Sequence, residues 1–145
     1  LRQLLAADPQ SAQAQAADGF GALGLAVFFG QLRSVATLLA AGADANRAAA
    51  NAMRVAPIHS ACAQADEALA CRLVHLLLAF GADPNARQQA GWTPLHAAAH
   101  RNQAHLIRLL RLGGADPQLT HDAGLSAIEL ARDEGKAAAL ASLTA

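Results

Sequence analysis

Apolar residues along this chain recur in short runs, and each run is followed by the same three-residue sequence, Gly-Ala-Asp. This sequence begins at Gly42, Gly81 and Gly114, so its copies lie 39 and 33 residues apart. The apolar runs that precede it cover residues 35–39, 73–78 and 106–112. The last run has apolar residues at the spacing of one helix face. Self-similarity at such a period is typical of a stacked array of repeated units.

Each unit carries the signals of two short helices joined by a reversal. In the clearest unit, Thr93 suits the N-cap and Pro94 suits the first turn, where a missing N–H costs nothing. Asn102 stands where the chain must reverse, and Gly30 and Gly135 stand at the same offset in other units. Gly and Asn are the residues that tolerate a left-handed helix C-cap. The pattern therefore predicts helix pairs with a tight turn inside each pair.

Four helix pairs follow from this pattern, preceded by a single helix over residues 1–8. First helices are predicted to begin near residues 22, 57, 94 and 127, and second helices near residues 31, 68, 103 and 136. The loops between pairs are predicted over residues 43–56, 82–93 and 115–126. Because no single unit buries its own apolar face, we expect these pairs to fold only as a stack.

The second unit departs from the others in length. His59 to Gly81 is 22 residues, whereas His96 to Gly114 is 18. The extra residues fall around 65–68, and neither Gly nor Asn ends the first helix there. Either that helix runs one turn longer or the turn between the helices bulges. We interpret the insertion as a tolerated surface feature, with a bump that contacts a partner as the alternative.

Residues 88–117 resemble the ankyrin repeat. From Gly91 the chain reads Gly-Trp-Thr-Pro-Leu-His-Ala-Ala-Ala, and Gly-Ala-Asp-Pro follows at Gly114. Pro-Ile-His at residues 57–59 is an imperfect copy, and Ser-Ala-Ile-Glu at 126–129 occupies the same place in a degenerate last unit. At residues 21–24, Gly-Ala-Leu-Gly replaces the usual Thr-Pro-Leu-His.

The resemblance implies an all-α ankyrin-repeat solenoid, built from stacked helix-turn-helix pairs with short β-hairpin finger loops. Residues 1–145 form a single domain in this interpretation, with a partial repeat at 1–18 and repeats at about 19–46, 47–85, 86–119 and 120–145. The structural motif positions are Gly42, Pro57, His59, Gly81, Thr93, Pro94, Leu95, His96 and Gly114. In this family the motif histidine hydrogen-bonds the backbone of the neighbouring loop, which assigns that role to His59 and His96.

Composition excludes several functions. The net charge is zero, with 11 basic and 11 acidic residues, so the chain has no electrostatic footprint for nucleic acid or an anionic membrane. No apolar run approaches the roughly 18 residues of a membrane-spanning helix. Two cysteines do not make a disulfide scaffold and fit the reducing cytoplasm. The Ala-rich and Lys-poor usage suggests a bacterial gene, and a start at Leu1 rather than Met leads us to expect further sequence upstream.

Candidate catalytic and metal sites are weak. His96 and His100 lie four residues apart on one predicted helix, as a two-ligand metal face would require, but no carboxylate or cysteine supplies an obvious third ligand. Cys62 occupies a small-residue position that we expect to be buried, and Cys71 begins a second helix with more exposure. No base or oxyanion site accompanies either thiol. We predict no catalytic residue, no metal and no cofactor.

The remaining polar candidates have structural interpretations. Asp44, Asp83 and Asp116 are one repeat apart, so we expect them to form turns along one edge rather than converge on a site. Three further histidines are expected on the surface or in loops: His75, His105 and His121. Arg108 and Arg111 are expected on the solvated convex face.

The resemblance places the functional signal in a concave groove formed by the fingers and the first helices. Mapped repeat by repeat, the groove candidates are Phe20, Phe28, Phe29, Met53, Val55, Gln64, Gln89, Trp92, His100, Arg101, Leu125 and Arg132, with Asp133 beside the last. Aromatic and Arg side chains dominate interface energetics. The alternative is packing: one of Phe28 and Phe29 lies in the core, and Trp92 braces its finger against the next.

We therefore predict a non-catalytic protein–protein interaction module, a monomer or weak dimer located in the cytoplasm, whose partner is another protein and not nucleic acid or a membrane. The alternative is a regulatory or targeting module of a larger enzyme whose catalytic part lies outside this sequence. Metal binding through His96 and His100 is a third possibility, from a different class.

Overall fold

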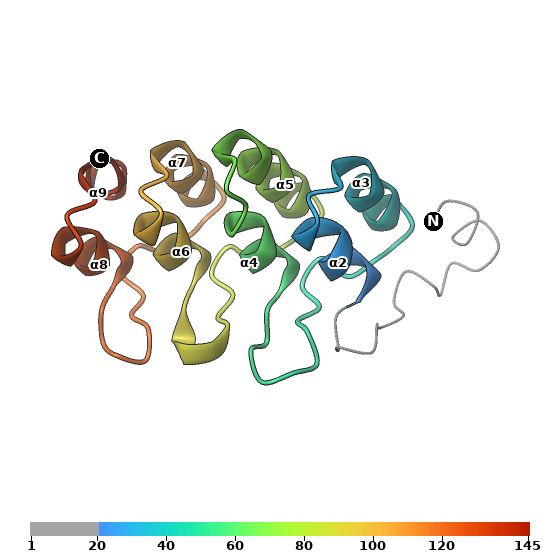
Figure 1. Cartoon of the computed structure of the whole chain (residues 1–145), viewed down its shortest axis with the longest axis horizontal. Coiled ribbons are helices and arrows are strands. Elements are labelled where there is room, and N and C mark those ends of the chain that lie inside the picture. Colours follow the sequence, from blue (N-terminus) through green and yellow to red (C-terminus); the bar gives the residue numbers. More distant parts are fainter. Residues whose placement is uncertain (1–20) are drawn as a thin grey trace.

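The computed structural model describes residues 21–145. The predictions for Phe20, the partial repeat 1–18 and the helix over residues 1–8 lie outside the described residues. Helix pairs stand side by side in a row, with the second helices in one layer, the first helices in another, and the connecting loops projecting together beyond the first helices (Figure 1). The part of the chain that the structure describes contains eight α-helices and no strand. The predicted all-α class is confirmed.

The eight helices form four pairs in chain order. They are α2 (Ala22–Phe28) with α3 (Leu32–Ala40), α4 (Pro57–Cys62) with α5 (Glu67–Ala79), α6 (Pro94–His100) with α7 (Ala104–Leu112), and α8 (Ala127–Asp133) with α9 (Ala137–Thr144). Each predicted helix start lies within one residue of the observed one. The longest of these helices has 13 residues, and none in residues 21–145 is long and apolar enough to traverse a lipid bilayer.

The core lies between the two layers and runs along the whole row. First helices contribute few large apolar residues, such as Ile58 in α4 and Leu95 in α6, and otherwise present small ones such as Ala98. Second helices fill the space between neighbours with leucines, of which Leu73 and Leu106 are fully buried. Small side chains on the first helices let the two layers approach closely, so the buried surface belongs to the stack and not to any single pair.

Left-handed residues follow three of the four first helices, as the sequence predicts; α4 is the exception. Gly30, Asn102 and Gly135 have φ angles of 67°, 56° and 68°, and each lies in the turn between the two helices of a pair. Asn102 also accepts a hydrogen bond from the backbone N–H of Ala139 at 2.8 Å, at the start of the second helix of the next pair. The turn between the two helices of one pair is therefore also hydrogen-bonded to the second helix of the next pair.

The insertion in the second unit takes a form that the sequence did not indicate. The helix α4 is not lengthened, and the turn between α4 and α5 is little enlarged. The extra residues lengthen the second helix instead: α5 has 13 residues, whereas α3 and α7 have 9. Asp66 caps the extension by accepting from the N–H of Ala68 at 3.0 Å. Cys71 consequently lies one turn inside α5 rather than at its start.

Glu67, in the added turn, explains why the extension is tolerated. Its Oε2 accepts the backbone N–H groups of His105 and Leu106 at 3.1 and 3.2 Å. These N–H groups belong to the first turn of α7 and have no partner within their own helix. The added turn therefore caps the second helix of the next pair. The negative charge of the carboxylate also interacts favourably with the positive end of the dipole of that helix.

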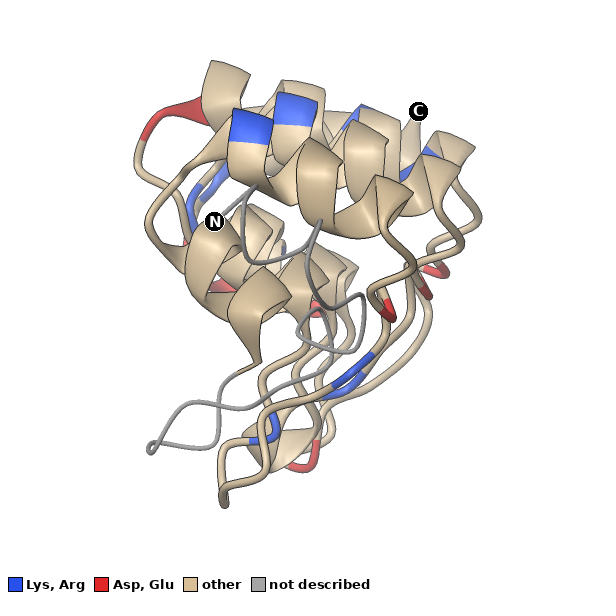
Figure 2. Ribbon diagram, turned by 90° about the vertical axis from the view of Figure 1, so that its right-hand side faces the viewer, with Lys and Arg blue, Asp and Glu red and all other residues tan. Residues whose placement is uncertain are grey.

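The Gly-Ala-Asp sequences form the turns that follow the second helices. Asp44, Asp83 and Asp116 each accept a hydrogen bond from the backbone N–H two residues further on, at 2.8–2.9 Å. Such Asx turns are a common use of aspartate in loops. Acidic residues line up along this edge of the molecule (Figure 2). The predicted turn-forming role of these aspartates is confirmed.

Two asparagines clamp neighbouring turns together. Asn46 donates from Nδ2 to the carbonyl of Gly81 at 2.9 Å and accepts the N–H of Asp83 through Oδ1 at 2.6 Å. Asn85 makes the same two bonds one repeat later, to Gly114 at 3.2 Å and from Asp116 at 2.7 Å. A single side chain thus satisfies a donor and an acceptor of the next turn, which sets the spacing between consecutive pairs.

Each loop between pairs folds back on itself as a finger closed by one backbone hydrogen bond. The bonds run from Ala49 N to Val55 O, from Gln88 N to Trp92 O, and from His121 N to Leu125 O, at 2.9–3.0 Å. An isolated bridge joins Thr120 and Ser126. The fingers are hairpin-like, but they are too short to form strands in the described residues, so the predicted β-hairpins are wrong in that detail.

Neighbouring fingers are joined near their tips. Gln89 donates its backbone N–H to the carbonyl of Met53 at 2.8 Å, and Asp122 donates to the carbonyl of Ala90 at 2.9 Å. The third finger passes so close to Gly91 that a Cβ there would lie 3.0 Å from the backbone nitrogen of Asp122. Gly91 also has a φ of 75°, so both the space and the conformation require glycine.

We expect Asn85→Ala to lower the free energy of unfolding by about 1–2 kcal/mol, because two hydrogen bonds between turns are lost. Urea denaturation followed by circular dichroism measures this change. Gln118→Ala is the matched control, since Gln118 occupies the same position in the third Gly-Ala-Asp turn and its side chain clamps no other turn in residues 21–145. Equal losses in both variants would contradict the clamp.

Candidate partner-binding groove

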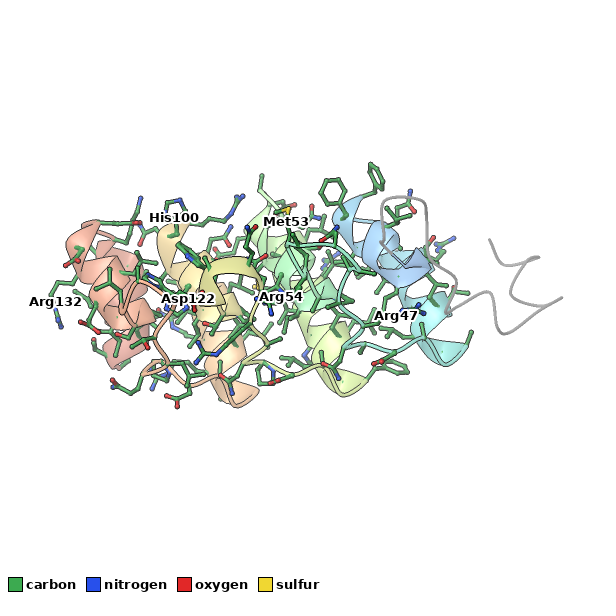
Figure 3. All side chains as sticks on the ribbon, turned by 90° about the horizontal axis from the view of Figure 1, so that it is seen from below. Arg47, Met53, Arg54, His100, Asp122 and Arg132 are labelled. Atoms are coloured by element: carbon green, nitrogen blue, oxygen red, sulfur yellow. The ribbon has the colours of Figure 1, made fainter. Side chains whose placement is uncertain are left out.

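A hollow of about 520 Å³ lies along the first helices and fingers of the first three described pairs. Six predicted groove residues line it: Phe28, Met53, Val55, Trp92, His100 and Arg101. Five further residues complete the lining: His59, Ser60, Ala63, Gln88 and Ala97. We call this hollow the groove. Met53 and His100 mark two points along this face of the molecule (Figure 3).

The other predicted residues lie outside this lining. Phe29 stands next to Phe28 at the α2 end, Gln89 is exposed at the tip of the second finger, and Arg132 is exposed near the end of α8. Gln64 has a structural contact: its Nε2 donates to the carbonyls of Val27 and Phe28 at 2.9 and 3.0 Å. It thereby caps the C-terminal end of α2, whose last carbonyls lack helical partners.

Phe28 and Phe29 are exposed aromatic residues. Their side chains are 57% and 67% exposed, and their rings meet edge to face with centroids 5.2 Å apart. The expectation that one of them packs in the core is wrong. The core face of α2 is supplied instead by residues such as Leu23 and Val27, and the two rings follow at the end of the helix, beyond that face.

Trp92 both lines the groove and braces the fingers. Its ring stacks on the imidazole of His121, in the third finger, with centroids 5.7 Å apart and planes 15° apart. It also meets the ring of His100, on α6, edge to face at 6.0 Å. The bracing contact that we posed as an alternative is present together with the groove contact, so Trp92 is held in place from two sides.

His121 is the residue of this region that sequence reasoning missed. It lies in a loop, as expected, but it is only 7% exposed, and its ring centroid is 5.0 Å from that of His96. Its Nδ1 accepts the backbone N–H of Ala123 at 3.0 Å. No periodic pattern marks the position, because it becomes buried only when the third finger stacks on Trp92.

The motif histidines connect two of the first helices, α4 and α6, to the fingers that follow them. His96 accepts the N–H of Thr93 through Nδ1 at 3.1 Å and donates from Nε2 to the carbonyl of Leu125 at 2.9 Å. His59 repeats this pattern with Ala56 at 3.0 Å and Ala86 at 2.7 Å. An acceptor at Nδ1 and a donor at Nε2 define one neutral tautomer, because a backbone N–H can only donate.

Both motif histidines favour the neutral form. Burial lowers the pKa of His59 and of His96 below the usual 6.5, although hydrogen bonds to the carbonyls of Ala86 and Leu125 act in the opposite direction. Among nearby charged groups, Asp83 raises the pKa of His59, whereas His121 and Arg87 lower that of His96. Protonation would place an N–H at Nδ1 against the N–H of Thr93 or Ala56 and break the hydrogen bond between them, at the start of each helix.

The candidate metal-binding histidines and the two cysteines are hydrogen-bonded or at least partly buried in the structure. Both ring nitrogens of His96 are occupied, and Nδ1 of His100 pairs with Glu134 at 2.8 Å. In residues 21–145, no three His, Cys, Asp or Glu side chains gather in a metal-binding arrangement. Both cysteines are free; burial raises the pKa of the Cys62 thiol to about 12 and also raises that of Cys71, so neither is activated as a thiolate.

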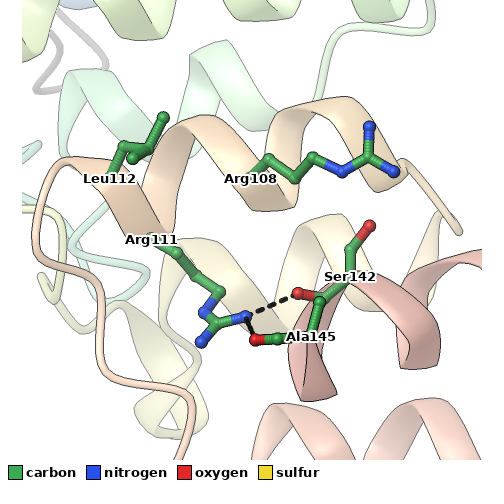
Figure 4. Close-up of a pocket in the computed structure, with 5 residues that line it drawn as sticks. All are labelled: Arg108, Arg111, Leu112, Ser142 and Ala145. Carbon is green, nitrogen blue, oxygen red and sulfur yellow. Dashed lines mark hydrogen bonds between the residues drawn. The ribbon is translucent and has the colours of Figure 1, made fainter.

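Arg111 is expected on the solvated convex face, but the structure places it differently. Arg111 is half-buried, and its guanidinium donates to the carbonyls of Ser142 and Ala145 at 2.7 and 3.2 Å, as Figure 4 shows. It therefore caps the last turn of α9 instead of standing free in solvent. Arg108 is exposed, as expected, and the Leu112 side chain beside them is 87% exposed.

Stacked helix pairs, repeated turns and projecting fingers define this chain as an α-helical repeat solenoid. Residues 58–111 match the family model for ankyrin repeats (many copies), so this part of the chain consists of ankyrin repeats. None of the curated proteins searched matches the chain. Ankyrin repeats are generally protein–protein interaction modules, and the family is typically non-catalytic.

We expect the free energy of unfolding to fall as the pH is lowered from 7.5 to 5.5. The unfolded histidines bind protons near pH 6.5, whereas the folded ones resist protonation, so their contribution is complete above pH 6.5 and is lost below it. Each group contributes at most about 1.4 kcal/mol per pH unit.

Urea denaturation at several pH values measures this dependence. His96→Gln should flatten the slope between pH 7.5 and 5.5, and His105→Gln, at an exposed position on α7, should leave it unchanged. A slope that is the same in the wild type and in His96→Gln would show that the motif histidine does not carry the effect.

Proposed function

We propose that this chain is a non-catalytic module that recognises another protein through the groove. The observation that carries the proposal is the convergence of Phe28, Met53, Trp92 and Arg101, from two helices and two fingers, on one apolar hollow. Its volume of about 520 Å³ leaves room for side chains of a partner. Aromatic, Met and Arg side chains are the types enriched where proteins meet.

Exposure supports the same proposal. Phe28, Phe29 and Met53 are each more than half exposed, although large apolar side chains are usually buried. Grouped apolar exposure on one face marks a contact surface more often than scattered exposure does. A thioether side chain such as that of Met53 can also adapt to the shape of a partner.

The mechanism that we infer is binding by a preorganised surface. The groove residues sit on elements that are tied to one another by the asparagine clamps, the motif histidines and the bonds between fingers. Trp92 is fixed between His100 and His121 before any partner arrives. Such a surface loses little conformational entropy on binding. A cytoplasmic location belongs to the same proposal and agrees with the two free thiols.

Replacing Phe28 and Met53 by serine should abolish capture of the partner while the protein stays folded, because both side chains are exposed. The measurement is affinity capture from lysate of the source cells, read by mass spectrometry, with circular dichroism melting as the check on folding. We expect loss of at least about tenfold in the captured partner. Trp92 is left intact, since its removal would also loosen the fingers.

Leu112→Ser is the matched control. It removes an exposed apolar side chain from the opposite layer, on α7, and should retain the same partner as the wild type. Loss of capture in Leu112→Ser, with capture kept in the Phe28→Ser, Met53→Ser variant, would move the binding surface to the second helices and overturn the proposal.

A further inference from the structure

The two ends of the groove differ in the side chains that border them. At its α2 end it is bordered by the edge-to-face pair Phe28 and Phe29, and Met53 follows on the first finger. At its α6 end it is bordered by Arg101, which directly follows the helix at its C-cap position. The α2 end of the groove is therefore apolar, whereas the α6 end carries the positively charged guanidinium of Arg101.

The groove lining to which Arg101 belongs contains no acidic side chain among the described residues, and no hydrogen bond or salt bridge engages the Arg101 guanidinium in the structure. The side chain is exposed, so its charge is available to a partner. The carboxylate of Glu134 is outside this lining and pairs with Nδ1 of His100 at 2.8 Å.

The other titratable residues of the groove lining also carry no negative charge. The other lining groups that can carry charge are His59 and His100, both of which are neutral or positive and never negative. An acidic group on a partner would meet a cation at Arg101 and no repelling carboxylate in the lining, whereas a basic group would meet the like charge of Arg101. Charge complementarity of this kind sets specificity and orientation more than raw affinity.

Resting on the function proposed above, we infer that the partner presents a segment with large apolar side chains at one end and an Asp or Glu at the other. The apolar side chains occupy the space between Phe28, Met53 and Trp92, and the carboxylate pairs with Arg101. Helix axes pack about 8–10 Å apart, so α2 and α6 are separated by about 20 Å. That distance corresponds to about six residues of an extended segment.

A displayed library of random 12-residue peptides, selected on the immobilised full chain, tests this inference. Wild-type protein should enrich peptides in which a large apolar residue is followed or preceded, about six positions away, by Asp or Glu. Arg101→Glu should reverse the charge preference to Lys or Arg at that position and keep the apolar residue. Arg101→Lys should preserve the acidic preference. Arg108→Glu, the same charge change on the outer face, should select like the wild type.

The outcomes separate the two proposals. Apolar peptides without an acidic bias, or a bias that Arg101→Glu does not reverse, would overturn the partner chemistry while leaving the groove as the binding surface. Enrichment no greater than that of the Phe28→Ser, Met53→Ser variant would overturn the groove itself, and the inference with it. A reversal caused equally by Arg108→Glu would show that net charge, and not Arg101, sets the preference.

Affinity measured with one selected peptide completes the test. Fluorescence anisotropy should show that Arg101→Glu weakens binding about tenfold or more, and that replacing the peptide's acidic residue by Lys restores it. Melting curves of the variant establish that it is folded. Weakening that the Lys peptide does not reverse would count against a direct contact between Arg101 and the peptide.

Discussion

The burial of each helix pair by its neighbour is the constraint on which this structure depends. A pair of helices of 6–13 residues cannot enclose its own leucines, so stability exists only between pairs. That burial alone does not fix how far or in which register the pairs stack. The polar contacts do so: Asn46 and Asn85 clamp consecutive turns, and His59 and His96 connect α4 and α6 to the fingers that follow them.

The groove is a consequence of that register. Its residues come from three helix pairs, and they meet only because the pairs are held at a fixed spacing. Trp92 shows how closely scaffold and surface are related, since the same indole stacks on His121 and faces the groove. Protonation of His96 at Nδ1 would break the bond in which that atom accepts the N–H of Thr93, at the start of α6, so low pH would weaken the helix that carries His100 together with the stack.

The extended helix α5 illustrates how the array accommodates irregularity. Its added turn does not project as a separate feature, because Glu67 caps α7 and Gln64, in the preceding turn, caps α2. The second unit is therefore tied to the pairs on both sides by side chains from the inserted region. An insertion that satisfies orphan backbone groups in this way strengthens the stack.

The sequence by itself determined the helix pairs, their starts, the left-handed turns at Gly30, Asn102 and Gly135, and the aspartate turns, because these depend on local preferences repeated at a regular period. It also indicated six of the groove residues through repeat alignment. Only the tertiary structure decided where the inserted residues go, that His121 is buried, and that Arg111 caps α9. Those features arise from contacts between units about 30 residues apart, and no local pattern encodes such contacts.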